Sequence, residues 1–245
     1  MTQRTAFITG GTGGIGSAIV RYLFDQGHRV CTNFRDAAKA ERWHAGMKSE
    51  GIDVCMVPGD VSDAAACVEM IRGVEEKCGP IDILINNAGI TRDSTFHKMD
   101  YEQWTSVINT NLNACFNVTR PVIEGMRERK WGRIVQISSI NGHKGQFGQS
   151  NYAAAKAGMH GFTISLAQEN ARFGITVNTV SPGYVGTEMV MAVPEDVREK
   201  IIAQIPMGRL GRPEEIAHAV AFFTGEQSSW ITGANLAING GHYMS

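Results

Sequence analysis

Residues 5–16 read TAFITGGTGGIG, an apolar run that passes directly into a loop rich in glycine. Thr5–Thr9 has the composition of a buried strand, and Ser17–Asp25 continues in a helical pattern. Glycines between a strand and a helix allow a tight turn and let the backbone approach a pyrophosphate at the helix N-terminus. The stretch predicts a nucleotide-binding strand–loop–helix unit, with a purely structural turn as the alternative. The residues expected to contact the nucleotide are Gly10, Thr12, Gly13, Gly14, Ile15 and Gly16.

Six further apolar runs of strand length follow, separated by segments long enough for helices. They are Arg29–Asn33, Asp53–Pro58, Ile81–Asn86, Gly132–Ser138, Ile175–Ser181 and Asn235–Ile238. Nearly continuous apolar strands that alternate with helices are typical of a parallel sheet covered on both faces. We therefore predict an α/β protein with a single Rossmann-type domain over residues 1–245. Its core is a doubly wound parallel sheet of about seven strands with helices on both faces.

Composition excludes several classes of partner. The chain has 245 residues, a formal net charge of −1 and 19% charged residues, so no global field favours nucleic acid or an anionic membrane. No apolar run approaches the roughly 18 residues that cross a bilayer, and no signal-peptide pattern precedes Thr5. The five cysteines, which form neither a CxxC pair nor a pattern with histidine, are Cys31, Cys55, Cys67, Cys78 and Cys115. We predict a cytoplasmic protein with reduced structural thiols and no metal site.

The residues after the second and third strands indicate which dinucleotide binds. An acidic side chain after the second strand would bond the 2′-hydroxyl of NAD and repel a 2′-phosphate. Here Arg35 stands at that place, and its guanidinium favours the 2′-phosphate of NADPH. A solvated arginine at a strand end is the alternative. Gly59, Asp60 and Val61 follow the third strand, where the Asp60 carboxylate could reach the adenine amino group.

The fourth strand is followed by small residues and an amide, which suit the floor of a crevice beside a dinucleotide. These residues are Asn87, Ala88, Gly89, Ile90 and Thr91. A helical pattern then starts at about Tyr101 and includes Asn111. Because asparagine is unfavourable inside a helix, we expect the Asn111 side chain to have a polar partner.

A candidate acid–base site lies in Ser138–Lys156, which reads SSINGHKGQFGQSNYAAAK. The segment opens at the end of an apolar strand and closes in an Ala-rich helical pattern. Tyr152 and Lys156 are four residues apart, so on a helix they project from one face about one turn apart. A serine at the strand end that faces this pair could act with it on a carbonyl, although such a pair alone is more often structural.

Several motifs now combine in one order: TGGTGGIG, NNAG, Asn111, Ser139, Tyr152-x-x-x-Lys156 and Ser181-Pro182-Gly183. In this the chain resembles the short-chain dehydrogenase/reductase family over its whole length. The resemblance implies that Tyr152 donates a proton to a carbonyl oxygen, that Ser139 positions this oxygen, and that Asn111 organises a water relay. It implies that Lys156 lowers the pKa of Tyr152 and holds the nicotinamide ribose. Residues implied to flank the nicotinamide are Pro182, Gly183, Val185 and Thr187.

Within the family the chain resembles the acetoacetyl-CoA reductases of polyhydroxyalkanoate synthesis, through GQFGQ at 145–149, ITRD at 90–93 and PGY at 182–184. The resemblance implies an NADPH-dependent reduction of acetoacetyl-CoA to (R)-3-hydroxybutanoyl-CoA. Besides Ser139 and Tyr152, the residues implied to line the acyl-thioester pocket are Asp93, Gln146, Phe147, Gly148, Gln149, Gly183 and Tyr184. The sequence departs from these reductases over Thr32–Lys39.

Two alternatives remain open at this point. The first is a 3-oxoacyl-[acyl-carrier-protein] reductase of fatty acid synthesis, which would receive an acidic carrier on a basic surface near Arg92, Arg127 and Arg129. The second is a dinucleotide-sensing protein that keeps the fold without turnover. Both alternatives would have the same glycine loop as an acetoacetyl-CoA reductase, so the loop does not distinguish the three hypotheses.

The resemblance also implies an assembly, and the sequence suggests a moving part. Family members assemble through the helices that carry Asn111 and Tyr152, so we expect a homotetramer. Small and apolar residues of these helices that could form the interface are Ala114, Phe116, Ala157, Phe162 and Leu166. The strand–helix order loosens over residues 184–212, and we predict that this segment is a flap over the substrate.

Overall fold

The computed structural model describes residues 2–244. Seven strands form one parallel sheet in the order β3-β2-β1-β4-β5-β6-β7. They are β1 (Thr5–Ile8), β2 (Arg29–Phe34), β3 (Val54–Pro58), β4 (Ile83–Asn86), β5 (Gly132–Ile137), β6 (Ile175–Pro182) and β7 (Asn235–Ile238). The predicted sheet is confirmed, and each strand boundary lies within two residues of its predicted place. The order reverses between β1 and β4, which opens a crevice at their carboxyl ends.

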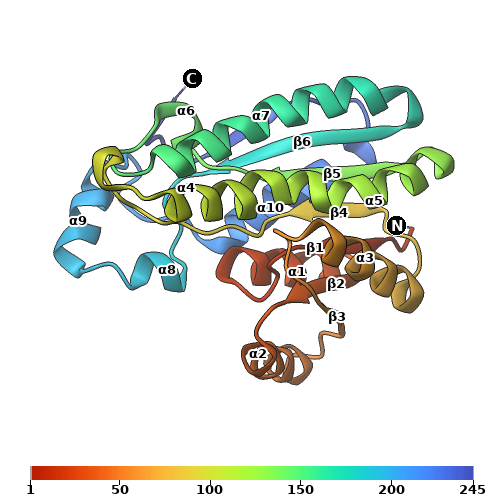
Figure 1. Cartoon of the computed structure of the whole chain (residues 1–245). Coiled ribbons are helices and arrows are strands. Elements are labelled where there is room, and N and C mark those ends of the chain that lie inside the picture. Colours follow the sequence, from red (N-terminus) through yellow and green to blue (C-terminus); the bar gives the residue numbers. More distant parts are fainter. Residues whose placement is uncertain (1, 245) are drawn as a thin grey trace.

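Helices cover both faces of the sheet (Figure 1). They are α1 (Gly14–Asp25), α2 (Ala37–Ser49), α3 (Ala64–Cys78), α4 (Tyr101–Ile108), α5 (Ala114–Arg129), α6 (Asn141–Lys144), α7 (Ser150–Asn170), α8 (Glu188–Met191), α9 (Glu195–Ala203) and α10 (Pro213–Thr224). Shorter helical turns occupy Phe96–Lys98, Asn109–Asn113, Ala171–Phe173 and Glu226–Ser228. In residues 2–244 no helix is long and apolar enough to cross a membrane.

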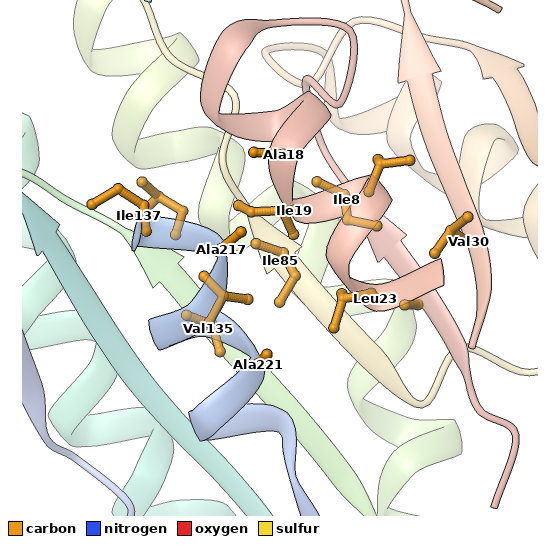
Figure 2. Packing of buried hydrophobic residues seen from close by; sticks show 14 of the residues in the cluster. Ile8, Ala18, Ile19, Leu23, Val30, Ile85, Val135, Ile137, Ala217 and Ala221 are labelled. Carbon is orange, nitrogen blue, oxygen red and sulfur yellow. The ribbon is translucent and has the colours of Figure 1, made fainter. Parts of the chain in front are cut away.

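Each central strand is buried on both faces, which explains its continuous apolar sequence. Ala6 and Ile8 of β1 join the core under α1 and α10, whereas Phe7 points to the core under α3 and α5. Figure 2 shows the first of these cores, where Ile19 of α1 and Ala217 of α10 lie beside Ile85 of β4. Side chains alternate along a strand, so a run buried on both sides has to be apolar at every position.

The structure corrects one residue of the expected interface. Ala114 is only 5% exposed and belongs to the core under α5, so it cannot meet another chain. Phe116, two positions later, is 57% exposed. Residues two apart on a helix point to nearly opposite sides, and this is why the pair divides between core and surface.

Residues 184–212 leave the sheet after β6 and return before α10. They contain the short helices α8 and α9, and Val185 forms an isolated parallel bridge with Gly211 at the base of the segment. The excursion is therefore anchored at its two ends. Its opening and closing as a flap stays a prediction.

Candidate active site

The glycine loop fits tightly between the ends of β1 and β4. Gly10 has φ +66°, a left-handed conformation, and a Cβ there would lie 3.1 Å from the Cα of Ala88. A Cβ on Gly16 would collide with the carbonyl oxygen of Gly10. These two positions therefore require glycine, because of conformation at the first and close approach at the second. Helix α1 begins at Gly14, three residues before the predicted start at Ser17, since the last glycines form its first turn.

Side chains from neighbouring strand ends hold this loop in place. The backbone N–H groups of Asn87 and Ala88 each donate to Thr9 Oγ1 at 3.0 Å. Asn33 at the end of β2 accepts from Gly10 N at 2.9 Å and donates to the Gly59 carbonyl at 2.9 Å. Sequence reasoning assigned no role to Asn33. In the sequence, Asn33 was visible only as an amide near the end of a predicted strand. The structure shows that its side chain is only 5% exposed.

A cavity of about 340 Å³ lies at the carboxyl ends of β1, β4, β5 and β6. It joins most of the predicted cofactor residues to the predicted acid–base residues. Its lining comprises Gly10, Gly13, Gly14, Ile15, Gly16, Lys39, Asn87, Ala88, Gly89, Ile90, Thr91, Ile137, Ser138, Ser139, Tyr152, Lys156, Pro182, Gly183, Val185, Thr187, Glu188 and Val190. Thus segments from residue 10 to residue 190 meet in one space.

The residues of this cavity fit a dinucleotide. Gly13 precedes α1 at the N-cap position and has no side chain that could accept a hydrogen bond. The first backbone N–H groups of α1 therefore lie beside the cavity without a side-chain acceptor. Free N–H groups at a helix N-terminus favour an anion such as a pyrophosphate. An adjoining hollow of about 400 Å³ is lined by Thr12, Arg35, Asp36 and Lys39. Lys39, which sequence reasoning did not select, lines both spaces and adds a second cation beside Arg35.

The remaining predicted cofactor residues lie beside this hollow. Arg35 pairs with Asp60 at 3.3 Å, and Asp60 also accepts from the Ser62 N–H at 2.9 Å. The neighbouring Arg35 and Ser62 groups hold the pKa of Asp60 below its usual value, against the effect of burial. The side chain of Val61 is buried in the core, so only its backbone could meet a ligand. Gly59 contributes its carbonyl to the Asn33 contact.

The two adjacent serines have different tasks. Ser138 Oγ donates to the Lys156 carbonyl at 2.9 Å and lies 3.3 Å from His160 Nε2, so it joins β5 to α7. Ser139 Oγ accepts from the Asn141 N–H at 3.1 Å and lines the cavity, where its hydroxyl also acts on Tyr152. This geometry favours Ser139 as the serine that contacts a substrate.

Tyr152 and Lys156 lie on α7 as their spacing predicted. The Nζ atom of Lys156 is 5.6 Å from the centre of the Tyr152 ring and donates to the Ile137 carbonyl at 2.7 Å. Burial lowers the pKa of Lys156 to about 8. Burial also raises the pKa of Tyr152 to about 12, although the Ser139 hydroxyl acts to lower it.

The expectation that Lys156 favours the phenolate of Tyr152 stays a prediction. Withdrawal of the phenol from water outweighs the effect of its neighbours. The Lys156 ammonium group is engaged by Ile137 rather than by the phenol oxygen. In the protein without ligands, Tyr152 is therefore a neutral phenol that carries its proton at physiological pH.

Asn111 has the polar partner that its position in a helix predicted. It lies in the π-helical turn Asn109–Asn113, where its Oδ1 accepts from the Ile90 N–H at 2.8 Å. Its Nδ2 donates to the Ile90 carbonyl at 2.9 Å. The paired bonds hold the strand-end segment against the cavity. A Cβ on Gly89 would lie 2.9 Å from Asn111 Oδ1 and 3.6 Å from Lys156 Nζ, so the three residues converge.

Of the predicted substrate residues, Ser139, Tyr152 and Gly183 line the main cavity, and the others lie outside its lining. Gln149 donates to Asp93 Oδ2 at 2.8 Å, and Ser94 N donates to the Gly148 carbonyl at 2.8 Å, so two loops form a rim. Gln146 accepts from Lys144 at 2.9 Å. Phe147 is 87% exposed and walls no pocket here.

Tyr184 has a pKa raised by burial and by the charge of Asp93 on that rim. It lines a hollow of about 720 Å³ beside α10 and the C-terminal residues, and its ring stacks on His242 at 5.7 Å. The acyl-thioester pocket stays a prediction. Glu188 and Val190, from residues 184–212, line the main cavity.

Comparisons with known proteins agree with this site. The family described as short chain dehydrogenase matches residues 4–198. An acetoacetyl-CoA reductase of Allochromatium vinosum is 54% identical over 98% of this chain and 99% of its own length. One of Cupriavidus necator is 52% identical over 100% of both chains. A 3-oxoacyl-[acyl-carrier-protein] reductase of Pseudomonas aeruginosa is 41% identical over 99% of this chain and 98% of its own length. The chain belongs to the short-chain dehydrogenase/reductase family, oxidoreductases that use a nicotinamide dinucleotide.

Proposed function

We propose that the protein is an NADPH-dependent acetoacetyl-CoA reductase that forms (R)-3-hydroxybutanoyl-CoA in polyhydroxyalkanoate (polyhydroxybutyrate) biosynthesis. The observation that carries the reaction type is the meeting of Ser139, Tyr152 and Lys156 with the glycine loop at one cavity. The named reductases that match across the whole chain support the substrate.

The side chains of the cavity suit a carbonyl reduction. A bound nicotinamide dinucleotide supplies the hydride to the carbonyl carbon. Ser139 donates a hydrogen bond to the carbonyl oxygen, where negative charge develops. Tyr152 holds its proton in the free protein and can deliver it to that oxygen. The Lys156 ammonium, which persists below about pH 8, lies near the ring and favours the phenolate as the proton leaves.

The choice of NADPH rests on Arg35 and Lys39, which line the hollow beside the glycine loop. We expect Arg35→Ala to raise the KM for NADPH about tenfold and to leave the KM for NADH unchanged, because a charge-assisted bond to a phosphate contributes roughly 1.5–3 kcal/mol. Lys39→Ala should act in the same direction. Arg42→Ala, an exposed arginine of the same helix α2, is the matched control. Equal effects of Arg35→Ala on both cofactors would show that it binds no 2′-phosphate.

The substrate proposal is tested with purified protein and NADPH. Acetoacetyl-CoA should be reduced with a kcat/KM at least equal to that for acetoacetyl-carrier protein. A strong preference for the carrier-linked substrate would overturn this proposal in favour of the fatty-acid reductase.

Two of the three arginines of the basic surface that an acidic carrier would use make contacts within the chain. Arg129 donates to the Ile81 carbonyl at 2.7 Å, and Arg127 donates to Asn170 at 3.0 Å with its guanidinium 4.0 Å from the Phe173 ring. Arg127 and Arg129 thus serve contacts within the chain, whereas Arg92 is an exposed cation that a carrier could meet.

A further inference from the structure

Three cysteines that are distant in the sequence meet at one edge of the sheet. Cys31 of β2 and Cys55 of β3 are register partners in neighbouring strands, so they project from the same face. Cys78 is the last residue of α3, the helix that covers this face. The three Sγ atoms all lie within 4.8 Å of one another.

The cluster is remote from the candidate active site. Cys31 and Cys55 lie in the amino-terminal halves of parallel strands, whereas the cavity lies beyond the carboxyl ends. Strand β3 is the edge strand (Figure 1), and Cys55 is partly exposed on it. Cys31 and Cys78 are buried. An ion could therefore enter from the side of Cys55 without passing through the core.

Three sulfur atoms at this spacing suit a thiophilic divalent cation. Tetrahedral Zn²⁺ with bonds of about 2.3 Å places its thiolate sulfurs about 3.8 Å apart, so the cluster needs only a small contraction. Three protein ligands leave the fourth position to water, which is accessible beside Cys55. Thiolates select zinc-like ions over Mg²⁺ and Ca²⁺.

The charges around the cluster also favour binding. Hydrogen bonds from Cys31 and Cys78 lower the pKa of Cys55 to about 6, with further help from Lys77 and against the effect of Asp53. Burial raises the pKa of Cys78, while Arg29, which donates to the Cys78 carbonyl, acts to lower it.

We propose that Cys31, Cys55 and Cys78 form a three-thiolate binding site for Zn²⁺ or a similar thiophilic divalent cation. Binding forms three metal–sulfur bonds, leaves one water on the ion and releases one proton for each thiol that is deprotonated. The complex has a net charge of −1, which the nearby Arg29 and Lys77 side chains offset. Its role is structural, because it ties α3 to the edge of the sheet.

The test uses the full chain, reduced and freed of metal. Titration with Cd²⁺ should produce thiolate-to-metal charge-transfer absorption that saturates at one equivalent. Zn²⁺ should compete with a chromophoric chelator, raise the unfolding temperature and release protons on binding. No charge-transfer absorption, or no competition with the chelator, overturns the proposal.

Variants locate the site. Cys55→Ser is the preferred variant because Cys55 is partly exposed. It should weaken Cd²⁺ binding by about 100-fold or more, because loss of a residue that only hydrogen-bonds to a metal ligand already lowers metal affinity by up to about 100-fold. Cys67→Ser changes a buried thiol outside the cluster and should keep full binding. Equal binding by both variants would overturn the assignment. Thermal unfolding of each metal-free variant separates loss of the ligand from loss of the fold.

Discussion

Tyr152 lies where burial keeps its phenol protonated, with a pKa raised to about 12. We predict that Tyr152→Phe lowers kcat/KM for ketone reduction by about 10²–10⁴-fold, the usual contribution of a general acid. Its unfolding midpoint should match that of the unmodified protein. The control is Tyr101→Phe on α4, where the ring is 80% exposed. Retained turnover in Tyr152→Phe would exclude the proposed acid, and retained dinucleotide binding without turnover in the unmodified protein would favour the sensing alternative.

His160 couples the same region to pH. Its Nε2 lies 3.3 Å from Ser138 Oγ, and its ring centre lies 4.3 Å from that of His143. Burial, His143 and Lys156 lower the pKa of His160 to about 4. A free histidine titrates near 6.5, so between these two values the unfolded chain binds more protons than the folded one. This group's contribution to stability is therefore complete above about pH 6.5 and is lost as the pH falls toward 4.

The measurement is the free energy of unfolding in denaturant at several pH values between 4 and 7. His160→Asn should reduce the loss of stability on acidification, because the residue that takes up the proton on unfolding is removed. His97→Asn makes the same change at an exposed histidine and controls for the substitution itself. An unchanged pH dependence in His160→Asn would contradict the assignment.

At the scale of elements, the turn from β1 to α1 depends on Gly16. A Cβ there would collide with the Gly10 carbonyl and lie 2.8 Å from Asn87 Nδ2. We expect Gly16→Ala to cost about 1–3 kcal/mol of stability, as overpacking does elsewhere, and to weaken dinucleotide binding. A Cβ on Gly46 of α2 meets nothing within 4 Å, so Gly46→Ala should stabilise the protein by about 0.5–1 kcal/mol. Chemical denaturation and dinucleotide titration measure both effects. Equal stability of the two variants would contradict the steric argument.

At the scale of the whole molecule, the outer surfaces of α5 and α7 offer an interface for the proposed homotetramer. Phe116 is exposed beside a groove of about 480 Å³ that also contains Phe162 and Leu166. Phe116→Glu should lower the mass measured by light scattering, because a charge would be buried in the assembled interface. Phe96→Glu, at another exposed phenylalanine, should leave the mass unchanged. A monomeric unmodified protein would contradict the proposed assembly.

The seven strands were predictable because burial on both faces requires continuous apolar runs. The first and last residues of each run can be recognised in the sequence. The spacing of Tyr152 and Lys156 on one helix face was predictable for the same local reason. It was harder to predict which face of a helix is buried. Ala114 and Phe116 look alike as candidates for an interface, and only the packing of α5 on the sheet separates them.

By itself, then, the sequence determined the parallel α/β architecture, the glycine loop and the placement of Tyr152 and Lys156 on one helix face, because each depends on periodicity or on neighbours along the chain. Tertiary structure alone decided three features of the site. Asn33 holds the glycine loop, Lys39 lines the same hollow as Arg35, and burial raises the pKa of Tyr152. It also gathered Cys31, Cys55 and Cys78, which show no motif. Such contacts arise where strands and helices far apart in the chain are brought into register, and local sequence patterns carry no information about that register.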